Sequence, residues 1–154
     1  MREIRGDLQA QALTVGVVWS RFNEAVVRRE LDACLARLRE LGVSEGRLWV
    51  LSVPGALEIP VVLRRLAAAG RFAALIALGA VIRGETYHFE LVANESAAGI
   101  TRVQLDCVLP IANGVLTTDN DEQALARAVQ KGRDCAEAAV EMARLLAATG
   151  QALR

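Results

Sequence analysis

At 154 residues the chain has the length of a single domain with a sizeable core. Its 18 basic and 18 acidic side chains balance, and no apolar run reaches the ~18 residues of a membrane span, so neither nucleic acid nor a membrane is an expected partner. Hydrophobic residues other than glycine make up 53% of the chain; counted with glycine and without tyrosine they reach roughly 60%, above the average for soluble domains, which predicts apolar surface between subunits.

The first predicted strand covers residues 14–19, a short apolar run typical of strands buried on both faces. It ends in a loop that contains Phe22, at the carboxyl end of the strand, which is the usual ligand edge of an open α/β sheet. Phe22 either faces a ligand there or folds back onto the core. Apolar residues at helical spacing between Val27 and Leu41 then predict a structural helix that ends at Gly42.

The second predicted strand covers residues 48–53, and Pro54 and Gly55 follow it directly. A helix is predicted over residues 57–69, where Gly70 ends it. This geometry brings the backbone amides near Ala56 and Leu57, together with the Glu58 carboxylate, to the same edge of the sheet. Alternatively, Glu58 is only a first-turn acid that stabilises the helix dipole.

The third predicted strand covers residues 73–78, and a dense polar segment follows it. Glycines at 79 and 84 allow a tight turn and a close approach to a ligand. Apolar residues at helical spacing from Phe89 to Ile100 place His88 in the first turn of a helix, where backbone amides attract anions. Charge, hydrogen-bond donors and a titratable ring come from Arg83, Glu85, Thr86 and His88.

The fourth predicted strand covers residues 108–116, with Pro110 near its start. Asn120 is an N-cap candidate, and Gln123 lies in capping-box register with it. Taken alone, Arg127 on the following helix is a surface charge. Lys131 and Gly132 interrupt the periodicity, so a separate last helix is predicted over residues 134–146.

The three cysteines, Cys34, Cys107 and Cys135, are odd in number and widely spaced in apolar surroundings. They are predicted to be reduced core residues, and neither a disulfide framework nor a metal site is expected. One histidine in the whole chain also argues against zinc. Met1 is followed by a charged segment unlike a signal peptide, so a cytoplasmic protein is expected.

The alternation of strands and helices predicts one α/β domain over residues 1–154, with about residues 1–12 as a peripheral segment. The expected architecture is a flavodoxin-like, three-layer fold with a four-stranded parallel sheet and helices on both faces. The edge of this sheet combines an aromatic ring, a carboxylate, one imidazole and anion-binding turns, which suits acid/base chemistry on a phosphorylated small molecule. No phosphate-loop lysine motif, dinucleotide fingerprint or nucleophile elbow is present.

At these residues the sequence resembles the lumazine synthase family. The shared motifs are RFN at 21–23, VPGALEIP at 53–60, GAVIRGETYHFE at 79–90, GVLTT at 114–118 and QALAR at 123–127. The resemblance implies a step of riboflavin biosynthesis, in which 5-amino-6-(D-ribitylamino)uracil and 3,4-dihydroxy-2-butanone 4-phosphate condense to 6,7-dimethyl-8-ribityllumazine, phosphate and water. It implies no cofactor and no metal.

By motif position, the resemblance also implies roles for individual residues. Phe22 stacks on the pyrimidine ring, and His88 shuttles protons. The ribityl chain is held by Ala56, Leu57 and Glu58, and the ring slot is lined by Ala80, Val81 and Ile82. The phosphate is cradled by Gly84, Glu85 and Thr86 and neutralised by Arg127, while Lys131 matches the lysine near the pyrimidine.

The resemblance further implies a homo-oligomer built on pentamers, with each site between two subunits. Asn113, Arg127 and Lys131 then serve a neighbour's site, and riboflavin synthase is a candidate partner protein. Asn113 stands where many relatives have an aromatic residue, so only its backbone amide is expected to bind. The connection from Arg127 to Lys131 is shorter than the commonest family pattern, which leaves a pentamer, a decamer and a larger shell open.

Two other classes share this fold. A non-catalytic protein could store flavin or lumazine in the same cavity, and a shell protein could retain only the assembly. The storage protein is expected to lack His88 or Arg127, and both residues are present.

Overall fold

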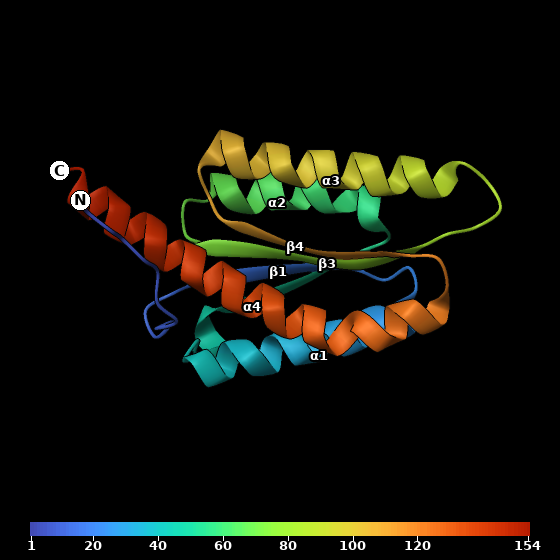
Figure 1. Cartoon of the computed structure of the whole chain (residues 1–154), viewed down its shortest axis with the longest axis horizontal. Helices are drawn as coiled ribbons and strands as arrows, with labels where there is room; N and C mark the ends of the chain where they lie inside the picture. Colours follow the sequence, from blue (N-terminus) through green and yellow to red (C-terminus); the bar gives the residue numbers. More distant parts are fainter.

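Four parallel strands form the centre of the computed structural model, which describes residues 1–154 (Figure 1). The strands are β1 (Val15–Ser20), β2 (Leu48–Val53), β3 (Ala74–Ile82) and β4 (Ile111–Thr118), in the order β2-β1-β3-β4. Val15 pairs with Leu48 on one side and Ala74 on the other. The strands therefore run in step and end at one edge of the sheet, and the predicted parallel α/β architecture is confirmed.

Helices cover both faces of the sheet, as predicted (Figure 1). One face carries α1 (Glu24–Leu41) and α4 (Asp121–Ala152), and the other carries α2 (Ile59–Ala68) and α3 (His88–Cys107). Two short 3-10 turns, η1 (Glu45–Arg47) and η2 (Ala56–Glu58), precede β2 and α2. The helix predicted over residues 57–69 thus begins as η2 and becomes α2 at Ile59.

The central strand β1 shows why these sequences form buried parallel strands. All six of its residues are buried. Val17 packs into the core under α1 and α4, whereas Val18 packs into the core under α2 and α3, because successive side chains of a strand point to opposite faces. Each fully buried valine contributes roughly 1.5–3 kcal/mol. A continuous apolar run is stable here because neither face meets water.

Two left-handed residues mark helix ends. Gly42 has φ 112° and donates its amide hydrogen bond to carbonyls of the last turn of α1, so the predicted cap is confirmed. Val108 has φ 47° and ends α3. The prediction that β4 begins at residue 108 is therefore wrong: the Leu109 amide still bonds to the Gln104 carbonyl at 3.2 Å, and the strand starts at Ile111.

The helix break predicted at Lys131 and Gly132 is also wrong. α4 runs without interruption from Asp121 to Ala152. Gly132 lies where α4 crosses α1, and a Cβ added there would stand 2.2 Å from the backbone oxygen of Glu30. Glycine therefore serves the close approach of two helices rather than the end of one.

The start of α4 follows the predicted N-cap closely. The Asn120 side chain accepts a hydrogen bond of 2.9 Å from the Gln123 amide. Gln123 in turn accepts from the amide of Asp119 at 2.8 Å, one residue before the position that a standard capping box uses. The N-cap is thus confirmed, and the reciprocal bond is shifted by one residue.

The N-terminal segment lies beside the second half of α4. It contains no helix or strand before β1. Asp7 forms an ion pair of 2.9 Å with Arg144, and Arg2 donates to the Ala152 carbonyl at 3.4 Å. The two ends of the chain are therefore neighbours, beyond the amino ends of the strands (Figure 1).

The three cysteines are free thiols. Cys34 and Cys135 are buried in the core between the sheet and the α1 and α4 helices, as predicted. Cys107 is only half-buried, and an Arg64 guanidinium nitrogen lies 2.8 Å from its sulfur. The core assignment holds only in part for Cys107, because this last residue of α3 packs against the margin of the core under α2 and α3. No helix combines the length and the apolar character needed to cross a membrane.

Candidate active site

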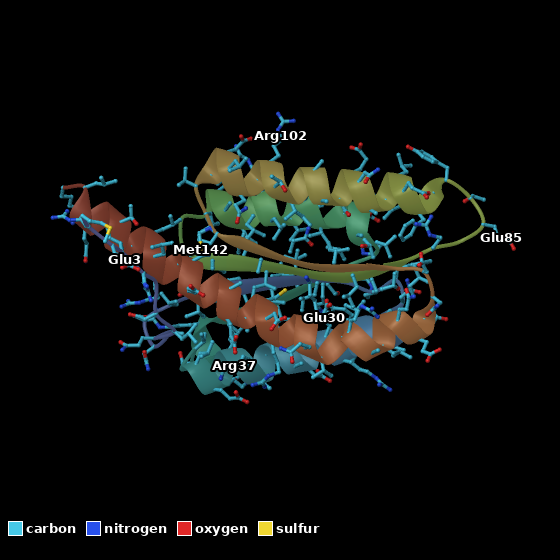
Figure 2. All side chains as sticks on the ribbon, in the orientation of Figure 1. Glu3, Glu30, Arg37, Glu85, Arg102 and Met142 are labelled. Atoms are coloured by element: carbon cyan, nitrogen blue, oxygen red, sulfur yellow. The ribbon has the colours of Figure 1, made fainter.

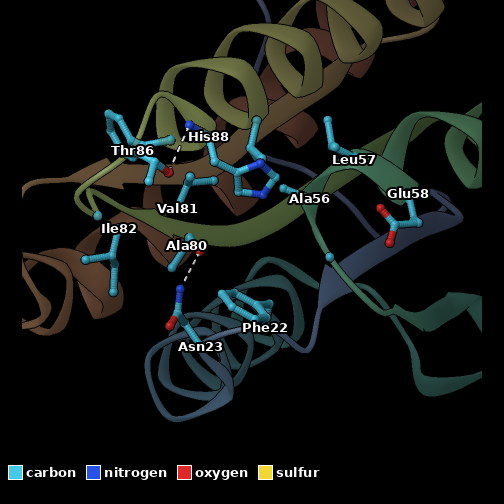
Figure 3. A pocket seen from close by; sticks show the side chains of 14 residues that line it. Phe22, Asn23, Ala56, Leu57, Glu58, Ala80, Val81, Ile82, Thr86 and His88 are labelled. Atoms are coloured by element: carbon cyan, nitrogen blue, oxygen red, sulfur yellow. Dashed lines mark hydrogen bonds between the residues drawn. The ribbon is translucent and has the colours of Figure 1, made fainter.

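A cavity of about 300 Å³ opens where β1, β2 and β3 end (Figure 3). Its walls come from the last residues of β3, from the loops that follow the three strands and from the first turns of α3. The lining includes the predicted site residues Phe22, Ala56, Leu57, Glu58, Ala80, Val81, Ile82, Gly84, Thr86 and His88. The predicted meeting of three strand ends at one pocket is thus observed.

Phe22 projects from the loop between β1 and α1. Its side chain is 71% exposed, so the alternative in which it folds back onto the core is wrong. The loop itself is fixed to β2, because the Phe22 amide donates to the Pro54 carbonyl at 3.1 Å and the Arg21 amide to the Val53 carbonyl at 2.9 Å. A rigid loop therefore presents a bare aromatic face to the cavity.

The second wall follows β2 and is formed by Gly55 and the η2 turn. Ala56 is buried, whereas Leu57 is 43% exposed at the mouth of the cavity. Glu58 precedes α2, and its side chain makes no capping hydrogen bond. Its carboxylate is exposed and is therefore free to accept hydrogen bonds from a ligand, although its position near the helix start also suits the dipole.

The back wall is the end of β3. Ala80 and Val81 are buried, and Ile82 is half-buried. The Asn23 side-chain amide donates to the Ala80 carbonyl at 2.9 Å (Figure 3). Asn23 has φ 61°, a left-handed conformation that asparagine tolerates better than most residues. This bond ties the first loop to the back wall and fixes the gap between Phe22 and β3.

His88 is the first residue of α3. Its imidazole points into the cavity, with Val81 beside it and Phe22 on the opposite side (Figure 3). The Thr86 hydroxyl accepts from the His88 backbone amide at 3.4 Å, so the loop turns into the helix without the imidazole being used as a cap. The His88 imidazole, which can donate and accept a proton, thus faces the Phe22 ring across an apolar slot.

Glu85 is not among the cavity-lining residues, and its side chain lies at the outer tip of the loop between β3 and α3 (Figure 2). Arg83 also points elsewhere. It forms ion pairs of 2.9 Å with Asp119 and 2.7 Å with Glu90, and it lies 4.5 Å from the centre of the Phe89 ring. The Asp119 hydrogen bond, followed by that of Glu90, raises the pKa of Arg83. Arg83 therefore anchors the loop rather than offering a free charge to the cavity.

Asn113, Arg127 and Lys131 do not line the cavity. Asn113 is exposed on the edge strand β4, where its side chain accepts from the Val115 amide at 2.9 Å. Arg127 is exposed on α4 and donates only to the Gln123 carbonyl of its own helix, at 3.0 Å. Lys131 is half-buried one turn further on. Within one chain these three residues therefore lie outside the cavity, on β4 and on α4.

Four cavity residues were absent from the predicted site: Asn23, Gly55, Phe89 and Val92. Asn23 belongs to the RFN segment, and Gly55 immediately precedes the predicted amides, so proximity in sequence was a usable signal for both. Val92 lies four residues after His88 on α3, where the same helix face is expected. Only the contact between Asn23 and Ala80 had no signal in the local sequence.

Comparisons with known proteins agree on one family. The family model described as 6,7-dimethyl-8-ribityllumazine synthase matches residues 12–147. A protein of that name from Azoarcus sp. (strain BH72) is 61% identical over 144 residues, which cover 94% of this chain and 92% of that protein. Its namesake from Burkholderia vietnamiensis is 62% identical over 145 residues, 94% of this chain and 86% of that protein. A third, from Cupriavidus necator, is 61% identical over 142 residues, which cover 92% of this chain and 86% of that protein.

Proposed function

This chain belongs to the 6,7-dimethyl-8-ribityllumazine synthase family, and we propose that the cavity between Phe22 and His88 is its active site. The chain is an enzyme of riboflavin biosynthesis. It condenses 5-amino-6-(D-ribitylamino)uracil with 3,4-dihydroxy-2-butanone 4-phosphate, and the products are 6,7-dimethyl-8-ribityllumazine, phosphate and water. The observation that carries the site assignment is the exposed Phe22 ring, which faces an imidazole across an apolar slot.

The ring-bearing substrate fits the inner part of the cavity. A pyrimidine stacks on the face of Phe22, and its other side meets the wall of residues 80–82. The ribityl chain carries hydroxyls, and it lies along η2, where backbone amides and the exposed Glu58 carboxylate supply hydrogen-bond partners. Apolar contacts thus bind the ring, while polar contacts orient the chain.

The phosphorylated substrate fits the outer part, near Gly84 and Thr86. Both residues line the cavity just before the amino end of α3, where unpaired backbone amides and the helix dipole favour an anion. Glu85 contributes its backbone amide here, since its side chain points away. Arg127 supplies the positive charge, and no carboxylate of its own chain neutralises this guanidinium.

His88 moves protons between the reacting groups. The amine of the uracil attacks the carbonyl of the butanone, and water leaves to form an imine. Removal of a proton then expels phosphate and leaves an enol, which tautomerises to a ketone. The second nitrogen attacks this new carbonyl, and loss of a second water closes the ring. Each step needs a group that accepts and returns a proton within hydrogen-bond reach, and the imidazole in the cavity provides it. Positioning supplies the remaining acceleration, and no cofactor is needed.

Each active site lies between two chains of a cytoplasmic homopentamer. Asn113, Arg127 and Lys131 lie outside their own chain's cavity, so they serve the cavity of a neighbour. Exposed apolar side chains on α4, including Leu125 and Val129 one turn apart, supply surface for such a contact. Riboflavin synthase is the proposed partner protein that receives the product.

Catalysis is tested by mixing the purified protein with both substrates and following the fluorescence of the product, with the native mass measured on the same sample. A well-formed assembly without product would favour a shell or storage role over catalysis.

The shared site is tested by mixing two defective subunits. Chains with Phe22→Ser and chains with Arg127→Ala are co-expressed under different tags, and doubly tagged oligomers are isolated. In random equal mixtures about a quarter of the interfaces carry both native residues, so activity should exceed the average of the two parent proteins. Oligomers of each single variant, carried through the same purification, are the controls. If each site were built within one chain, no verified mixed oligomer would show an excess.

A further inference from the structure

Glu30 is a carboxyl group that the proposed reaction does not use. It lies on α1 and points into the region between the sheet and α4 (Figure 2), and it has no exposed surface. One carboxyl oxygen, Oε1, accepts a hydrogen bond of 3.1 Å from the Gly79 amide, and the other has no partner. A buried polar group with an unpaired oxygen normally costs stability, so its presence indicates a role for the hydrogen bond that it accepts from Gly79.

The surroundings of Glu30 are tightly packed. α4 crosses directly over it, since the missing side chain of Gly132 would collide with the Glu30 carbonyl. Burial raises the pKa of Glu30 to about 9, against the opposing effects of the Gly79 amide and the Lys131 charge. At neutral pH the side chain is therefore an uncharged carboxyl group that acts as a hydrogen-bond acceptor in a fixed place.

Gly79 is where β3 enters the active site. A Cβ there would stand 2.7 Å from the Ser20 hydroxyl oxygen, so the Ser20 side chain fills the space beside Gly79. The Ala80 carbonyl directly after it accepts the Asn23 hydrogen bond of 2.9 Å. Asn23 precedes the first residue of α1, and Glu30 lies two turns further along the same helix. Two successive residues of β3, at the point where the cavity wall begins, are thus held by α1 and by its N-cap residue.

We propose that Glu30 is a positioning residue of the active site, whose carboxyl oxygen holds the Gly79 amide and so sets the depth of the wall formed by residues 80–82. This inference rests on the proposed role of the cavity. The wall meets the pyrimidine ring and not the phosphate, so Glu30 acts selectively on the ring-bearing substrate. Length and an acceptor oxygen are what the position requires, and negative charge is not.

Two substitutions separate these requirements. Glu30→Gln keeps the length and one acceptor oxygen without an acid. Glu30→Asp keeps the acid but is one carbon shorter, so the Gly79 amide loses its partner in a buried place. The readouts are the Kd of 6,7-dimethyl-8-ribityllumazine, from titration of its fluorescence, and the KM of each substrate.

We expect Glu30→Asp to raise the Kd of the lumazine and the KM of the ribitylaminouracil about tenfold, which corresponds to about 1.4 kcal/mol. The KM of the phosphorylated butanone should change by less than about twofold, and Glu30→Gln should stay within about twofold of the native protein throughout. A purely structural role would lower the folded fraction, and hence the apparent kcat, without changing Kd or KM in Glu30→Asp. That result, or a tenfold loss in Glu30→Gln, would overturn the inference.

Phe22→Ser separates this inference from the site assignment. If Phe22→Ser weakens lumazine binding and Glu30→Asp does not, the cavity stands and only the role of Glu30 is refuted. If Phe22→Ser binds lumazine as tightly as the native protein, the cavity is not the ring site and both proposals fail. Should Glu30→Asp not fold, the Kd of Glu30→Gln decides: a value within about twofold of native supports a neutral acceptor, and a tenfold rise rejects it.

Discussion

Gly132→Ala should destabilise the protein although alanine is the better helix former. The added Cβ would stand 2.2 Å from the Glu30 carbonyl oxygen and 3.0 Å from the Cys34 amide nitrogen. Carbon and oxygen normally approach no closer than about 3.3 Å, so α1 and α4 must move apart by about 1 Å. Both obstructing atoms belong to helix backbone and cannot rotate away. The cost is therefore near the upper end of the ~1–3 kcal/mol typical of overpacking.

Helix propensity opposes this cost by about 1 kcal/mol, so the expected net loss is about 2 kcal/mol of unfolding free energy. Gly150→Ala is the matched control, because it makes the same change in the same helix with nothing within 4 Å of the added carbon. It should stabilise the protein by ~0.5–1 kcal/mol. Both variants are compared with the native chain by urea unfolding at one protein concentration, since assembly makes stability concentration-dependent. Equal effects of the same sign would refute the close helix crossing.

Three further predictions concern the site and the buried acid. His88→Ala should lower kcat about 10²-fold in the product-fluorescence assay and leave residual turnover; an unchanged kcat would remove His88 from the mechanism. Arg127→Ala should raise the KM of the phosphorylated butanone far more than that of the ribitylaminouracil, because a charge-assisted bond is lost on one substrate only. Equal increases in steady-state kinetics would contradict that role. The native protein should lose stability as pH rises from 4.5 toward 9, because folded Glu30, whose pKa is raised to about 9, keeps a proton that the unfolded chain releases. Glu30→Gln has no such titrating group, so as pH rises its free energy of unfolding should increase relative to that of the native protein, by up to ~1.4 kcal/mol per pH unit. A difference that does not change with pH would show that Glu30 is already ionised in the folded state.

The fold was predictable where the local sequence alone determines an element. β2 has the predicted bounds because apolar residues end sharply at Pro54, and Gly42 supplies the left-handed cap that ends α1. Gly132 was misread because glycine lowers helix propensity locally, whereas its role depends on Glu30, a residue far away in sequence. Val108 was misread because a β-branched residue rarely adopts a left-handed conformation. Tertiary packing overrides the local preference in both cases.

The candidate site followed the same division. Phe22, Glu58 and His88 lie in the segments that follow β1, β2 and β3, so the parallel topology brings them to one edge of the sheet. Asn23 was missed because its contact with the Ala80 carbonyl joins two loops that no spacing rule relates. Glu30 gave no signal either, since an acid within a helix is normally solvated, and only the structure shows it beneath Gly79.

The position of the two chain ends bears on how this protein can be engineered. Arg2 reaches the carbonyl of Ala152, and the ends emerge at the side of the molecule opposite the Glu85 loop (Figure 1, Figure 2). A short flexible linker could join them, which would allow new ends to be opened in an exposed turn such as η1. A fluorescent or affinity module attached at either end would also sit far from the substrate entrance. The same geometry makes a circularly permuted chain an attractive scaffold for displaying cargo.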